Sequence, residues 1–252
     1  MNTIDINCDM GESFGNYQIG NDREIFPYIT SSNIACGFHG GDPIHMERTI
    51  KDAILHGVQV GAHPGFPDLA GFGRRKMDLP SDELKAIVKY QVSAIKGVAE
   101  SLGTSVRYVK PHGALYNLAA DDQAVSSTLV MTIREIDPGL MIMGLAGSVF
   151  HDVCNSEGMR FVAEAFADRK YEANGRLRSR SLQESVLTDP NAVTEQVMEI
   201  ILNKQVIAHD GTMVPIEAQS LCIHGDNPEA VSILQAIDEG LKKRGILKQS
   251  FG

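Results

Sequence analysis

The sequence lacks the features of a secreted, membrane-spanning or nucleic-acid-binding protein. Its N-terminus has no basic region followed by an apolar run, so it does not read as a secretion signal. No apolar stretch approaches the roughly 20 residues that a membrane span requires. The formal net charge of -9 disfavours a nucleic-acid backbone or an anionic membrane as the main partner. An anionic substrate must therefore meet a local concentration of positive charge.

Cysteine is scarce and its spacing is uninformative. None of the four cysteines forms a C-x-x-C pair, which argues against a zinc knuckle and against a disulfide framework. This usage favours a reducing compartment, and we expect the cytoplasm. Cys8, Cys36 and Cys222 each end an apolar run, and we interpret them as small buried side chains rather than as reactive thiols.

Familiar catalytic motifs are absent or out of context. The chain has no G-x-x-x-x-G-K-[ST] phosphate loop and no H-E-x-x-H zinc motif. Residues 11–15 match G-x-S-x-G, but a nucleophile elbow needs a helix directly after it, whereas Gly15 and Gly20 predict irregular chain. We therefore do not expect a serine-hydrolase triad.

The chain does contain short β-branched runs that alternate with longer stretches of helical period, which is typical of βα units on a parallel sheet. Seven or eight such units in 252 residues favour a closed, distorted TIM-like (β/α) barrel over an open doubly wound sheet, with residues 1–252 forming one domain. The predicted strands are 3–8, 32–36, 58–62, 106–109, 140–145, 160–165 and 221–224, with a further strand near 177–181 or 206–216.

Several helix boundaries are also predicted by capping signals. A helix is expected to end at Gly57, and another, with an apolar face from Leu84 to Leu102, at Gly103. A capping residue followed by proline at the first helical position predicts three helix starts, at Asp42-Pro43, Asp189-Pro190 and Asn227-Pro228.

Polar side chains follow most of the predicted strands. Functional residues of a parallel barrel gather at the C-terminal ends of its strands, so these clusters should share one pocket. A single histidine in such a place is usually a structural hydrogen-bonding group, but four of the eight histidines recur there, each beside glycine or proline. The expected pocket contains His39, His63, His112 and His224 with Asp9, Glu12, Glu164 and Asp226.

Two kinds of chemistry fit this pocket. Carboxylates whose pKa values are pushed apart by burial and by Lys110 or Arg169, together with imidazoles, would support general acid–base catalysis. Histidines with a carboxylate could instead hold a divalent metal ion, for which Asp9, His39 and His63 are the candidates.

Two basic segments could hold an anion. Residues 71–76 (GFGRRK) join flexible backbone to three positive charges, and guanidinium groups bind phosphate or carboxylate bidentately. The second segment, with Arg176, Arg178 and Arg180, we interpret as solvated surface. The binding residues that we predict are Asn7, Arg74, Arg75, Asp168, Arg169 and His224.

Five segments together resemble the LamB/YcsF family, which provides the A subunit of bacterial ATP-dependent 5-oxoprolinase. They are residues 5–15 (DINCDMGESFG), 35–42 (ACGFHGGD), 61–68 (GAHPGFPD), 109–116 (VKPHGALY) and 222–226 (CIHGD), and they span the chain. The resemblance implies a distorted barrel related to the glycoside hydrolase and deacetylase barrels. It also implies hydrolysis of the lactam 5-oxoproline to glutamate, coupled to ATP, with Mg²⁺ for the nucleotide and with partner subunits B and C.

The implied reaction accounts for the polar residues. Lactam opening at neutral pH is unfavourable unless it is coupled, and phosphorylation of the lactam oxygen would activate the carbon for attack by water. Our hypothesis makes Asp9 or Glu164 the base, one of His39, His63 and His112 the acid, and Lys110 with Arg169 the clamp for an anion. The sequence leaves open the choice within each group, which subunit binds ATP, and whether the chain forms a homo-oligomer.

Two other readings stay open. The first is a metal-dependent amidohydrolase or carbohydrate deacetylase of the same barrel type that acts alone and without ATP. The second is a non-catalytic subunit that presents the lactam to its partners. Burying so many titratable groups costs free energy that a binding cleft alone does not require, and this favours an enzyme.

Overall fold

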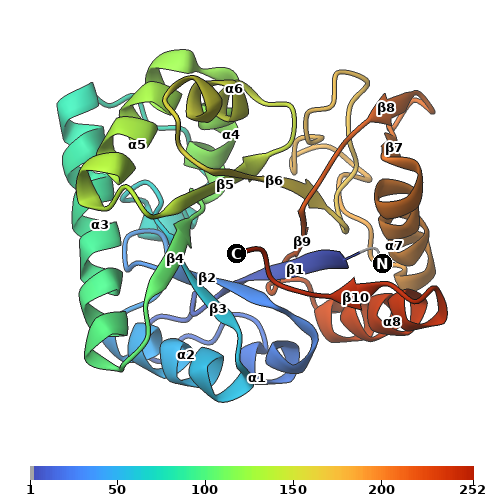
Figure 1. The fold of residues 1–252 in the computed structure, drawn as a ribbon, viewed down its shortest axis with the longest axis horizontal. Helices are drawn as coiled ribbons and strands as arrows, with labels where there is room; N and C mark the ends of the chain where they lie inside the picture. Colours follow the sequence, from blue (N-terminus) through green and yellow to red (C-terminus); the bar gives the residue numbers. More distant parts are fainter. Residues whose placement is uncertain (1–2) are drawn as a thin grey trace.

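The strands form a closed ring that is surrounded by helices (Figure 1). This computed structural model describes residues 3–252, so Met1 and Asn2, the first residues of the segment read for a secretion signal, lie outside the described residues. The barrel strands are all parallel and pair in the order β1-β2-β3-β4-β5-β6-β9, with β9 closing on β1. The predicted parallel barrel is confirmed, with seven strands: β1 (Thr3–Met10), β2 (Ser31–Ala35), β3 (Gln59–His63), β4 (Val106–Val109), β5 (Met141–Leu145), β6 (Phe161–Phe166) and β9 (Ser220–Ile223).

The sequence predicted a further strand near 177–181 or 206–216, and the second segment does contain strands, although they lie outside the barrel. Residues 177–181 form no strand, and β7 (Gln205–Ile207) pairs antiparallel with β8 (Met213–Pro215) outside the barrel. The segment between β7 and β8 turns at Gly211, whose φ is +88°, and is too short for the crossover that parallel strands need. The short β10 (Leu247–Lys248) adds to the edge of β1.

Local capping explains where the helices begin and end. The Asp42 side chain accepts hydrogen bonds from two backbone N–H groups at the start of α2, and Gly57 ends that helix at a φ of +66°. Asp189 caps α7 as predicted. The start predicted at Asn227 was two residues early, because residues 225–229 form turns before α8. The helices are α1 (Asp22–Ile25), α2 (Pro43–His56), α3 (Ser81–Ser101), α4 (Gly113–Asp121), α5 (Gln123–Ile136), α6 (Val149–Ser156), α7 (Pro190–Met198) and α8 (Ala230–Lys243).

Shorter helical turns complete the fold, at Phe26–Tyr28, Leu69–Gly71 and Glu199–Asn203. Within residues 3–252, none of the helices combines the length and the apolarity needed to cross a lipid bilayer.

Strand β1 shows how the fold positions the polar residues. Alternate side chains of a strand point to opposite faces, and Ile4, Ile6 and other apolar residues of β1 pack in the core beneath the helices. The intervening Asp5 and Asn7 contact polar side chains of the neighbouring strands β2 and β9. The inner side of β1 is therefore polar, and it leads to the ring of strand ends.

Candidate active site

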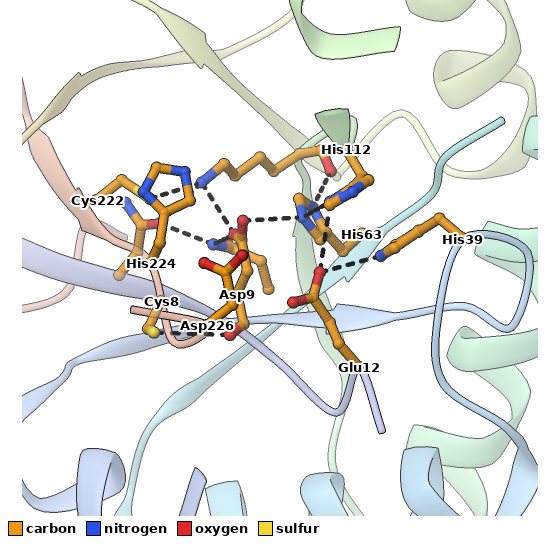
Figure 2. A network of polar contacts seen from close by, with 12 residues as sticks. Cys8, Asp9, Glu12, His39, His63, His112, Cys222, His224 and Asp226 are labelled. Atoms are coloured by element: carbon orange, nitrogen blue, oxygen red, sulfur yellow. Dashed lines mark hydrogen bonds and ion pairs between the residues drawn. The ribbon is translucent and has the colours of Figure 1, made fainter. Parts of the chain in front are cut away.

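Figure 2 shows the polar network of the site, to which Lys110 belongs through its contacts with Asp9 and Cys222. Lys110 directly follows β4 and is only 2% exposed. Its Nζ lies 2.7 Å from a Glu164 oxygen, 3.1 Å from Asp9 Oδ1 and 3.2 Å from Cys222 Sγ. Burial by itself would lower the pKa of Lys110, but Asp9 and Glu164 raise it well above its ordinary value. The site therefore holds a buried ammonium group.

Three histidine rings and Glu12 form the other half of the network. They come from the ends of different strands: His39 follows β2, His63 ends β3, and His112 precedes α4. His63 Nε2 lies 3.0 Å from His112 Nδ1, and the ring of His39 stacks on that of His112 with centroids 3.6 Å apart. Glu12 Oε1 lies 3.2 Å from His39 Nε2 and 3.4 Å from His112 Nδ1.

Asp9 joins the two halves, because its second oxygen lies 3.3 Å from His63 Nε2. Burial alone would raise the pKa of Asp9, but His63 and Lys110 hold it well below its ordinary value. Burial raises the pKa of Glu12 well above its ordinary value, and the charge of Asp9 adds to the effect. Two neighbouring carboxyl groups are thus pushed in opposite directions, which is the arrangement that acid–base catalysis uses.

His224 and two acidic residues border the site on the side of β9. The His224 Nδ1 lies 2.9 Å from Asp168 Oδ1. Burial would raise the pKa of Asp168, but His224 lowers it, so the carboxylate stays ionised. Asp226 forms an ion pair with Arg74 at 2.5 Å and lies 3.9 Å from a nitrogen of Arg180.

A cavity of about 530 Å³ opens over these residues. It brings together many of the side chains predicted from the strand ends, while Asn7 and Glu164 lie buried beneath Lys110 and hydrogen-bond to each other. Phe166 and Tyr116, which the sequence did not single out, add apolar wall. The lining residues that carry charge or titrate are Asp9, His63, Arg74, Lys110, His112, Tyr116, Arg169, Arg178, Arg180 and His224.

The cavity lining differs from the arginines that the sequence singled out. Arg75 does not line the cavity, because its guanidinium pairs with Asp68 of the same loop and is largely exposed. Arg178 and Arg180, which we interpreted as solvated surface, do line it. Their loop is held near the mouth because Arg169 donates hydrogen bonds to the backbone oxygens of Arg178 and Ser185. Long-range contacts of this kind leave no signal in the local sequence.

Tyr116 could have been found from spacing alone. It lies four residues after His112 and on the first turns of α4, so both side chains share one side of the helix start. The sequence also gave no sign that the Cys222 thiol would contact the ammonium group of Lys110.

A parallel barrel with titratable residues around a cavity at its strand ends defines the chain as a (β/α)-barrel enzyme. The LamB/YcsF family model matches residues 4–252. The chain belongs to the LamB/YcsF family, as the sequence motifs predicted.

Individual relatives agree with this membership. The chain is 49% identical to a protein of Acinetobacter baylyi that is named as the A subunit of 5-oxoprolinase, over 98% of both chains. It is 46% identical to the protein of the same name from Geobacillus thermodenitrificans, over 100% of this chain and 98% of the relative. The crystal structure of a lactam utilization protein from Thermus thermophilus superposes with a TM-score of 0.93 at 41% identity, covering 99% of this chain and 100% of that one.

A more distant structure supports the fold alone. A family 4 carbohydrate esterase from Streptomyces lividans superposes with a TM-score of 0.54 at 10% identity, covering 100% of this chain and 93% of that one. The predicted relation to the deacetylase barrels is therefore confirmed at the level of architecture.

Proposed function

We propose that this chain is the A subunit of a 5-oxoprolinase and that its cavity opens the lactam 5-oxoproline to glutamate. The observation that carries the proposal is the pair of buried carboxyl groups, Asp9 and Glu12, whose pKa values move in opposite directions beside a histidine cluster and a buried ammonium. Relatives at 46–49% identity bear the corresponding name over nearly their whole length.

Asp9 is our choice for the base. It lines the cavity, whereas Glu164, the other carboxylate considered, is fully buried and held by Lys110. An ionised Asp9 can take a proton from water as the water oxygen bonds to the lactam carbonyl carbon. The carbon–nitrogen bond then breaks, and the leaving nitrogen takes up a proton. We assign the role of proton donor to the cluster of His39, His63, His112 and Glu12.

The opposite side of the cavity suits an anion. The ammonium of Lys110 and the guanidinium groups of Arg169 and Arg180 meet there in a chain whose net charge is -9. They would hold the carboxylate of 5-oxoproline, and they would also accept a phosphoryl group on an activated lactam oxygen. We propose that ATP, carried with Mg²⁺, is the co-substrate of a cytoplasmic complex of this chain with subunits B and C.

Reconstitution of the complex tests the proposal. Glutamate release from 5-oxoproline is followed with ATP present, and each component is omitted in turn. The variants Asp9→Asn and His112→Ala should each lose about 10²–10⁴-fold in rate, the range for a removed acid or base. His151→Ala, on α6 and outside the cavity lining, is the matched control.

Undiminished glutamate formation by both site variants would remove these residues from the mechanism. Turnover of an N-acetyl sugar by this chain alone, without ATP or partners, would replace the proposed function by the deacetylase alternative.

A further inference from the structure

The hydrogen bonds of His63 and His112 determine where each ring carries its proton. His63 Nδ1 lies 2.7 Å from the backbone oxygen of Lys110, and His112 Nε2 lies 2.9 Å from the backbone oxygen of Phe72. A carbonyl oxygen only accepts hydrogen bonds, so the proton of each neutral ring lies on the nitrogen that faces the carbonyl. The other two nitrogens, His63 Nε2 and His112 Nδ1, therefore present lone pairs.

These two lone pairs face each other, because the nitrogens that bear them are 3.0 Å apart. Two carboxyl groups also border the same point: an Asp9 oxygen lies 3.3 Å from His63 Nε2, and Glu12 Oε1 lies 3.4 Å from His112 Nδ1. Two facing lone pairs at this distance repel each other unless a positive charge lies between them. That charge is either a proton shared by the two rings or a metal ion.

We propose that this cation is a divalent metal ion, bound by His63 Nε2, His112 Nδ1 and Glu12 with Asp9 beside it. Histidines that bind metals usually donate their second ring N–H to a backbone carbonyl or a carboxylate, as both rings do here. Two histidines, one carboxylate and an open side are a common donor set of catalytic zinc sites. The cavity lies on the open side, since His63 and His112 both line it.

His39 does not belong to the ligand set, although its ring lies in the same cluster. Its Nδ1 is buried and has no hydrogen-bond partner among residues 3–252. If Nε2 bound the metal, the proton would move to Nδ1 and be left buried without an acceptor, which is costly. The proton instead belongs on Nε2, which lies 3.2 Å from Glu12 Oε1 and can donate to it. His39 is therefore a positioning residue for Glu12.

Asp9, Cys222 and His224 form a second group of possible ligands. Two of them, Asp9 and Cys222, already contact the ammonium group of Lys110. The Lys110 ammonium lies 3.1 Å from Asp9 Oδ1 and 3.2 Å from Cys222 Sγ. A metal ion there would have to approach this fixed positive charge closely. The histidine pair is thus the favoured location.

The inference deepens the proposed function and rests on it only for its role in the reaction. When bound, such an ion would supply Lewis-acid stabilisation of the negative charge that develops on the lactam oxygen, while the proton that Asp9 takes from water would be available for the leaving nitrogen. Binding of the ion itself needs neither substrate nor partner subunits, so it can fail or succeed independently of oxoprolinase activity.

Titration of the chelator-treated, full-length chain with Co²⁺ and Zn²⁺ tests the site. We expect about one ion per chain and a visible Co²⁺ spectrum of nitrogen and oxygen ligands. His112→Ala and Glu12→Gln should abolish tight binding. His39→Asn should keep the stoichiometry but weaken affinity by about 10–100-fold, as removal of a residue that orients a ligand does. His224→Ala should bind as the unaltered chain does.

Imidazole ¹⁵N NMR of the unaltered chain gives the same answer without relying on variants that must fold. Added Zn²⁺ should shift His63 Nε2 and His112 Nδ1 and leave the other nitrogen of each ring protonated. No binding, binding that survives loss of His112, or a protonated imidazolium pair in the presence of excess Zn²⁺ would each overturn the proposal, the last in favour of the shared proton. Loss of binding in His224→Ala alone would move the site to the Lys110 side and overturn it too.

Discussion

Replacement of Lys110 by methionine tests whether the buried network depends on one ammonium group. Lys110→Met keeps a side chain of similar length but leaves Asp9 and Glu164 without their cation, at positions where Nζ lay 3.1 Å and 2.7 Å from their oxygens. Removing one member of a buried ion pair typically costs about 3–5 kcal/mol. We expect the free energy of unfolding at neutral pH to fall by about that amount.

The loss should depend on pH in a defined direction. With Lys110 present, the pKa of Asp9 is well below 3.8, so its stabilising contribution is complete above about pH 4 and is lost only as the pH falls through the lowered value. Without Lys110, one of the two cations that lower the pKa of Asp9 is lost while burial still raises it, so the folded variant protonates Asp9 at a higher pH than the unaltered chain does. The difference in stability between the two proteins should therefore be smaller at pH 4.5 than at pH 7.5.

Urea unfolding at the two pH values measures this difference. Because the chain has no tryptophan, far-UV circular dichroism is the suitable probe. Lys85→Met is the matched control, since Lys85 pairs with Glu135 on the surface and both side chains are about 40% exposed; it should change stability by no more than about 0.5 kcal/mol. A loss below about 1 kcal/mol for Lys110→Met, or an equal loss at both pH values, would refute the reasoning.

Three further predictions concern the anion side of the cavity, the barrel interior and the core. Arg180→Gln should raise the KM for 5-oxoproline in the reconstituted complex about tenfold, the effect of about 1.4 kcal/mol, while Arg75→Gln, outside the cavity, should not. Burial raises the pKa of Asp5 from 3.8 to about 6, so the folded chain loses stability as the pH rises through this window, by about 3 kcal/mol at most; Asp5→Asn should remove that decline in unfolding curves at pH 4.5 and 7. Leu129→Ala, at a 1% exposed position of α5, should cost about 2–5 kcal/mol in urea unfolding, whereas Met131→Ala, at 47% exposure on the same helix, should cost under about 0.5 kcal/mol.

The sequence by itself determined the barrel, several of its caps and the presence of a site at the strand ends. These features depend on local patterns: β-branched runs predict strands, Asp42 before a proline predicts a helix start, and polar residues directly after apolar runs predict the rim of a parallel barrel. The sequence predicted a strand near 206–216 but not its place outside the barrel, because its β-branched residues suit a barrel strand and a hairpin equally. Only the length of the turn between its two halves distinguishes them.

Tertiary structure alone decided how the polar residues share their charges and protons. Arg180 faces the cavity because hydrogen bonds from Arg169 to backbone oxygens hold its loop in place. No local sequence pattern predicts these hydrogen bonds. The tautomers of His63 and His112 depend on two carbonyl groups from other segments. Hydrogen bonds and buried charges act over a few ångströms in space, so their partners cannot be read from positions that are tens of residues apart along the chain.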